Sequence, residues 1–144
     1  TTLSLYLYRV TMNEHMRNVR RMNDVTTVDT PLSIDLHFLL TVWAANALAE
    51  QTILAWAMRQ LYQRPVLDRS MLSPEGGWTS SDVVHVIPAE LGHEELMRIW
   101  DALEPSYRLS LSYIARVVRI DPDPVPSGLP VVVRNLAMAQ QAVP

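Results

Sequence analysis

The stretch that decides the fold is Pro31-Leu32-Ser33-Ile34-Asp35-Leu36-His37-Phe38-Leu39-Leu40-Thr41-Val42-Trp43-Ala44-Ala45. Apolar and polar residues alternate along it, which is the pattern of a strand with one apolar face. The apolar side chains are Leu32, Ile34, Leu36, Phe38, Leu40 and Val42, and the polar ones are Ser33, Asp35, His37 and Thr41. We expect the rest of the chain to pair with this strand, to cover its apolar face or to extend from its ends.

The composition limits the possible classes of protein. A chain of 144 residues fits one domain and can bury a core. Its net charge of −3 provides no basic field, so we expect no nucleic-acid partner. The absence of cysteine excludes a disulfide framework, a thiol nucleophile and a thiolate metal site, and it suits a reducing cytoplasm. No run of eighteen apolar residues occurs, so no membrane span is predicted.

Three more stretches have the pattern of strands. Residues 3–10 and 107–120 alternate like the central strand, and residues 82–87 form a short strand that Pro88 closes. Residues 66–81 carry one proline and two glycines and are predicted to be irregular.

Two helices are predicted from the apolar spacing. Asn46 can cap a helix over residues 47–63, in which Leu54, Met58 and Leu61 share the buried face and Glu50 lies on the wet face. A shorter helix begins after Gly92, where Leu91 and Leu96 form a hydrophobic staple. The tryptophans within or beside these elements are predicted to be core residues. They are Trp43, Trp56 and Trp100.

The fold class predicted from these elements is α+β. We expect a mostly antiparallel or mixed sheet of about four strands, with two helices packed on one of its faces. This domain is predicted to span residues 1–120. Residues 121–128 carry three prolines and cannot form regular structure, so residues 121–144 are predicted to be a Pro-rich linker and a C-terminal interaction arm.

A catalytic site receives little support from the sequence. Asp35 and His37 with Ser33, or with Ser110 or Ser112, have the residue types of a Ser-His-Asp triad. Residues i and i+2 on a strand are about 6.5–7 Å apart, however, which is too far for Asp35 to orient His37 easily. No Gly-x-Ser-x-Gly motif occurs. The structural interpretation of these residues is a polar sheet face, with a salt bridge from Asp35 to Arg108 or Arg116.

Metal and cofactor sites are not predicted either. The four histidines have no metal-binding spacing, and the Gly76-Gly77 pair is not followed by the residues of a phosphate loop. The sequence therefore indicates no enzyme, no metal and no cofactor.

Two segments favour assembly. After the linker, Pro130, Val131, Val132 and Val133 form an apolar run that could add a strand to a partner's sheet, or could fold back on its own domain. The long loop over residues 11–30 contains methionines together with Arg17, Arg20 and Arg21, which would suit an interface, although a solvated loop is the alternative.

Several stretches together resemble the cap, or tail-terminator, proteins of extracellular contractile injection systems. They occur in the family's order over residues 3–120. They are residues 3–11 with Asn13, Arg17 and Asn18; residues 31–41; Leu61 with residues 65–67; Glu94-Glu95-Leu96 with residues 99–103; and residues 107–113. No single stretch is specific, whereas the ordered set is.

The resemblance implies a tail-terminator-like fold and a structural role without catalysis or cofactor. Members form a homohexameric ring that ends the inner tube and the sheath and holds the last sheath ring. The implied partners are further copies of the chain, the inner tube protein and the sheath protein. The implied location is a cytoplasmic assembly, within a phage-tail-like particle whose extracellular release is left open.

Two departures from the family pattern stand out. The helical segment that usually precedes the first strand is absent, and Gly92 stands where a Ser or Thr cap is common. Because the chain also begins without Met, we expect upstream sequence to be missing. A non-catalytic adaptor that binds a peptide or cargo without forming a ring remains the alternative function, and a small hydrolase is a further one.

Overall fold

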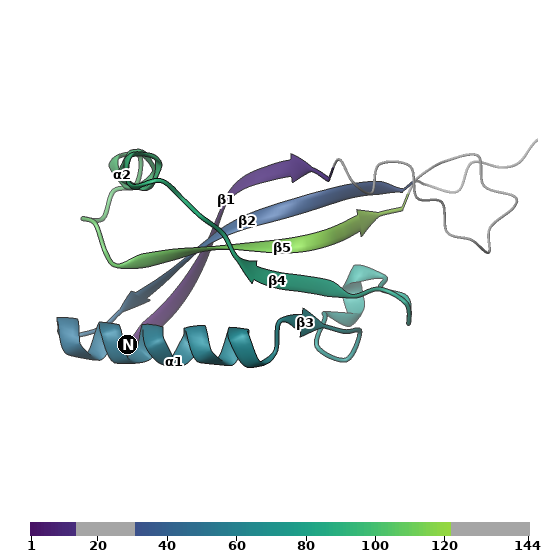
Figure 1. Ribbon diagram of the computed structural model, residues 1–144, viewed down its shortest axis with the longest axis horizontal. Helices are drawn as coiled ribbons and strands as arrows, with labels where there is room; N and C mark the ends of the chain where they lie inside the picture. Colours follow the sequence, from purple (N-terminus) through teal and green to yellow (C-terminus); the bar gives the residue numbers. More distant parts are fainter. Residues whose placement is uncertain (14–30, 122–144) are drawn as a thin grey trace, which may run out of the picture.

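The computed structural model describes residues 1–13 and 31–121 of the chain. Five strands form one sheet in the order β1-β2-β5-β4-β3, and all neighbouring pairs are antiparallel (Figure 1). The strands are β1 (Thr2–Met12), β2 (Leu32–Trp43), β3 (Val66–Leu67), β4 (Val84–Pro88) and β5 (Ser110–Ile120). The helices are α1 (Ala47–Gln63) and α2 (His93–Asp101), with a 3-10 helix at Pro74–Gly76.

The predicted α+β class is confirmed, with one strand more than expected. The additional strand is β3, which lies in the stretch predicted to be irregular and pairs with β4 through two residues only. Such a short strand has no alternation that a sequence pattern could reveal.

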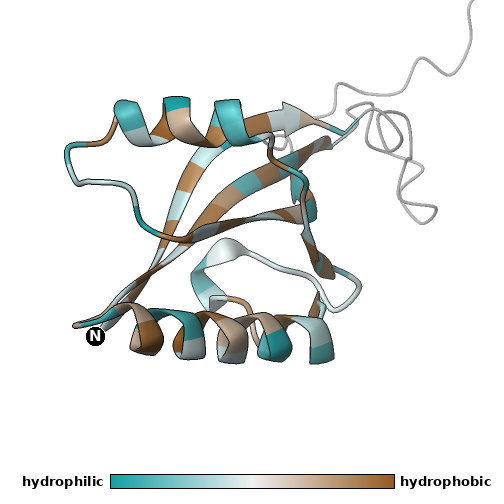
Figure 2. Cartoon of the chain, turned by 60° about the vertical axis from the view of Figure 1, so that its left-hand side comes forward, coloured by the Kyte–Doolittle hydropathy of each residue, from teal (hydrophilic) through white to brown (hydrophobic). Residues whose placement is uncertain are grey.

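Strand β2 lies between the two other long strands of the sheet. Leu40 is opposite Leu5 of β1 and Leu111 of β5, so these three side chains share a face. Apolar and polar residues alternate along the strands (Figure 2). We refer to the side of Leu40 as the even face and to the opposite side as the odd face.

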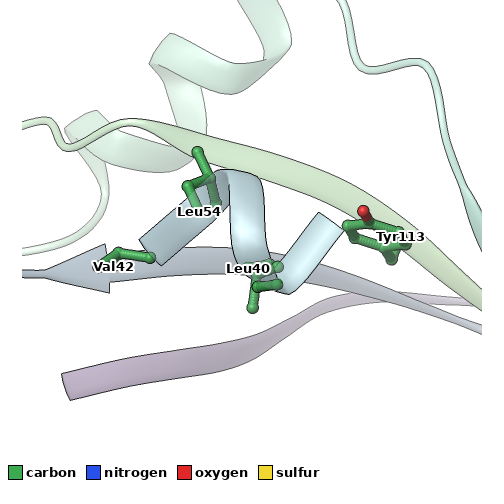
Figure 3. Packing of buried hydrophobic residues seen from close by; sticks show 5 residues of the cluster. Leu40, Val42, Leu54 and Tyr113 are labelled. Carbon is green, nitrogen blue, oxygen red and sulfur yellow. The ribbon is translucent and has the colours of Figure 1, made fainter. Parts of the chain in front are cut away.

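Helix α1 packs on the even face and forms the main core. Asn46 caps it by accepting a hydrogen bond from the Ala49 backbone N–H at 2.9 Å. Leu54 and Ala57 of the helix pack against β2 and β5. The core cluster consists of Leu40, Val42, Leu54, Ala57 and Tyr113 (Figure 3).

The predicted rotation of α1 is wrong in two places. Met58 is exposed, whereas Glu50 is buried. The reason is the partner of Glu50, because Arg108 donates a hydrogen bond to its carboxylate at 2.6 Å. Trp56, predicted to be a core residue, is exposed as well.

Helix α2 lies on the odd face, so the prediction that both helices pack on one face is wrong (Figures 1 and 2). Its Trp100 is buried, and the centre of its ring lies 6.1 Å from that of Trp43 and 5.8 Å from that of Tyr107. Arg9 of β1 pairs with Glu95 of the helix at 3.4 Å. The odd face therefore has its own aromatic cluster at the Trp43 end, which gives a second helix something to cover.

The odd face of β2 is buried although its side chains are mostly polar. Each odd-numbered residue from Ser33 to Thr41 is buried. On the even face, Leu32 is exposed, and the next three even-numbered residues are only partly buried. The predicted separation of polar and apolar residues is confirmed, but the polar side is the better covered of the two.

Candidate functional site

The first candidate site is a buried polar row on the odd face. It consists of Ser33, Asp35, His37 and Thr41 of β2, Tyr8, Thr11 and Asn13 at β1, and Ser110 and Ser112 of β5. A register shift between Leu7 and Arg9 in β1, and another opposite Asp35 in β5, interrupt the regular pairing here. Such bulges re-aim side chains, and both lie beside the polar residues of β2.

Hydrogen bonds between strands satisfy this row. Asn13 Nδ2 donates to both carboxylate oxygens of Asp35 at 3.0 and 3.2 Å. Thr11 Oγ1 and His37 Nε2 are 3.0 Å apart. The remaining pairs, each 2.8 Å apart, are Tyr8 Oη with Ser112 Oγ and Thr41 Oγ1 with Ser110 Oγ.

This geometry does not assemble a catalytic triad. His37 bonds to Thr11, whereas Asp35 is engaged by Asn13, so the carboxylate does not orient the imidazole. The hydroxyl of Ser112 bonds to Tyr8 rather than to His37. The pKa of His37 is lowered by burial and then by the nearby Arg9, which favours the neutral ring. The row can join three strands, and it has no activated nucleophile.

The two arginines predicted for the polar face have different partners. Arg116 Nε lies 3.7 Å from Asp35 Oδ2, so this alternative of the predicted salt bridge is confirmed. Arg108 pairs with Glu50 instead, and its guanidinium lies 5.8 Å from the centre of the Trp43 ring. Arg108 thus connects the beginning of α1 to the edge of the aromatic cluster.

Within residues 1–13 and 31–121, no group of three or more His, Asp or Glu side chains could hold a metal ion. A hollow of about 330 Å³ lies beside β4 and β5, and it is lined by Asp82 together with Arg116 and Arg119. Because opposite charges are mixed in it, the hollow does not select one ligand chemistry. In the same ranges, no helix is both long and apolar enough to cross a membrane.

The second candidate site is a pair of exposed apolar surfaces that the sequence reasoning missed. The β1 stripe is defined by Leu3, Leu5, Leu7, Val10 and Met12, which lie on the even face and are all exposed. The α1 outer face is defined by Leu48, Trp56 and Tyr62, which are exposed as well. The charge pattern of α1 could have revealed the second surface, because its 17 residues include only two charged ones.

The remaining predicted site residues lie outside the described part of the chain. They are Arg17, Arg20 and Arg21 of the long loop, and Pro130, Val131, Val132 and Val133 of the C-terminal arm. Their predicted roles in binding stay predictions.

Comparison with known proteins confirms the family inferred from the sequence. Residues 1–134 match the family described as the Pvc16 N-terminal domain. The fold is similar to the PVC sheath/tube terminator in its extended state, from a cryo-EM structure of an extracellular contractile injection system, with a TM-score of 0.59 and 18% identity. The match covers 97% of this chain and 50% of that chain, so the present chain spans half the length of that terminator. No curated protein matches the sequence.

Proposed function

The chain belongs to the Pvc16 N-terminal domain family, and from this membership we propose that it is the structural terminator of a contractile injection system. Copies of the chain form a homohexameric ring that ends the inner tube and the sheath and holds the last sheath ring. The particle resembles a phage tail, is assembled in the cytoplasm and acts outside the cell. The single observation that carries this proposal is the family match over residues 1–134, and the shared fold supports it.

The surface of the molecule is consistent with a protein that binds other proteins. The described residues present two exposed apolar surfaces, and the buried polar row is used for pairing between strands. Large exposed apolar patches on soluble proteins mark interaction sites. Both observations support a structural role rather than a catalytic one.

Two segments outside the described residues complete the proposal. Val131, Val132 and Val133 add a strand to the sheet of a sheath subunit, which main-chain hydrogen bonds would stabilise. Arg17, Arg20 and Arg21 contact the inner tube or a neighbouring copy, as arginine is enriched at interfaces. In this proposal, the domain spans residues 1–120 and the arm spans residues 121–144.

Deletion of the gene tests the terminator function. Particles assembled without the protein should have inner tubes of variable length and sheaths that detach, measured by electron microscopy of purified particles. Restoration of the wild-type gene should restore a uniform length. Particles of normal length and intact sheath in the deletion strain would contradict the proposal.

The arm is tested separately. A chain that ends at Asp121 should still cap the tube but release the last sheath ring, and replacement of Val131, Val132 and Val133 by serine should have the same effect at constant length. Normal sheath attachment in both variants would remove the arm from the proposal and leave the terminator function untouched.

A further inference from the structure

The two apolar surfaces are strongly exposed in the single chain. In the β1 stripe, Leu5 is 61% exposed and Met12 is 65% exposed. On the α1 outer face, Leu48 is 73% exposed and Tyr62 is 85% exposed. The residues of the β1 stripe follow each other along one face of a strand, and those of the α1 outer face lie within about a third of the helix circumference.

Helix α1 carries fewer charged residues than a surface helix usually does, although Gln51, Thr52 and Gln63 are exposed polar residues of it. A surface helix normally has charged residues opposite its core-facing stripe. The charged residues of α1 are Glu50 and Arg59, and Glu50 is buried against Arg108. Arg59 is therefore the one charge on the outer side, among Trp56, Tyr62 and other uncharged residues.

The two surfaces cannot cover each other within one copy. Leu54 and Ala57 hold the inner side of α1 against β2 and β5, so the outer face points away from the sheet. The β1 stripe lies on the sheet itself, beside the helix and beyond β2. Contact between the outer face and the stripe thus requires two molecules.

We infer that the β1 stripe of one copy packs on the α1 outer face of the next copy. This inference rests on the proposed ring and names its seam. The two surfaces together expose on the order of 1,000 Å², and their polar neighbours would bring the contact to the ~1,200–2,000 Å² of specific interfaces. A contact between two different surfaces is heterologous, and repetition of such a contact closes a ring when the rotation permits.

A symmetric alternative explains less of the molecule. If the β1 stripes of two copies packed on each other, the contact would be isologous and would end at a dimer. The outer face of α1 would then stay exposed with Leu48, Trp56 and Tyr62 in water. The heterologous seam covers both surfaces with one type of contact.

Two single-face variants of the full-length protein test the seam. Leu5→Glu places a charge in the β1 stripe, and Trp56→Glu places one in the α1 outer face. Burying an unpaired carboxylate should weaken the contact about a hundredfold, so each variant alone should be monomeric by native mass spectrometry where the wild type is a ring. Mixing the two variants should give a dimer, because one intact stripe and one intact outer face remain.

The mixing result separates a seam from general damage. Met71→Glu is the matched control, because Met71 is exposed but belongs to neither of the two surfaces. This variant should leave the ring intact. Circular dichroism should show folded protein for all three variants. Absence of a dimer in the mixture, rings formed by either single variant, or a monomeric wild type would each overturn the inference.

Truncation at Asp121 distinguishes the other possible occupant of the stripe. A truncated chain that still forms rings, and that loses them with Leu5→Glu, supports the second copy. If truncation abolishes the rings, the C-terminal segment makes the contact between copies, and the inference is wrong. Rings that persist in both single-face variants would show that the inferred contact is wrong. They would not contradict the terminator function, which the gene deletion tests.

Discussion

On the odd face of the sheet, polar side chains are buried and bonded across three strands, whereas on the even face the apolar side chains of β1 are exposed. Polarity alone would predict the opposite. The difference lies in what each face contacts: the polar row meets partners from neighbouring strands, and α1 covers the part of the even face over β2, β5 and β4 but not β1. Along β2, burial within one chain is therefore greater on the side that pairs internally than on the side that can bind another molecule.

The largest expected effect is a difference in the free energy of unfolding between substitutions in the covered and in the uncovered part of the even face. Leu40→Ala should lower the free energy of unfolding by about 2–5 kcal/mol, because it leaves a cavity in the core. Leu5→Ala, directly across the strand pair, should change it by about 0.5 kcal/mol in the monomer. Urea unfolding at low protein concentration measures both. Equal losses would show that the even face is covered throughout.

A smaller effect is expected on the odd face. Asp35→Ala should cost about 2 kcal/mol, because the amide of Asn13 loses a charged acceptor and Arg116 loses its ion pair. In a double-mutant cycle with Asn13→Ala, the double variant should lose less than the sum of the single losses. Strictly additive losses in urea unfolding would mean that the Asn13–Asp35 contact contributes nothing to the burial of this face.

The bond across β2 should be worth less again. Tyr8→Phe removes the hydroxyl that bonds to Ser112 at 2.8 Å and should lower the free energy of unfolding by about 1 kcal/mol. Tyr6→Phe is the matched control on the same strand, since Tyr6 is exposed, and it should have no measurable effect. The same loss in both variants would indicate that the phenol rings, and not the hydrogen bond, matter.

The smallest effect is a dependence on pH. Burial lowers the pKa of His37 below its ordinary value of 6.5, so the unfolded chain binds more protons as the pH falls below that value. The stability that the neutral ring contributes is complete above pH 6.5 and is lost on acidification toward the folded-state pKa. Unfolding of wild type and His37→Gln, measured on both sides of pH 6.5, should show a shallower loss in the variant. Parallel pH profiles would contradict this.

The sequence predicted the elements of the fold better than their surroundings. Alternation identified β1, β2 and β5, and the cap at Asn46 placed α1 correctly, because these are local signals. Which side of the sheet α2 would cover depends on Trp43 and Trp100 meeting across many residues, which no local pattern contains. The exposed state of Leu5 and Trp56 was missed for a related reason, because an apolar residue has the same spacing whether its own chain or another copy covers it.

The two edges of the sheet differ in length. Strand β1 offers an outer edge of eleven residues, with which no other described strand pairs, whereas β3 at the opposite edge has two residues. A partner strand could therefore pair along the full length of β1, but it could pair with only two residues at β3. Very short edge strands limit the addition of further strands to a sheet. Among the described strands, the sheet therefore has one edge long enough to pair with an added strand. For a protein proposed to end a filament, this asymmetry permits attachment from one side without offering a template for further growth on the other.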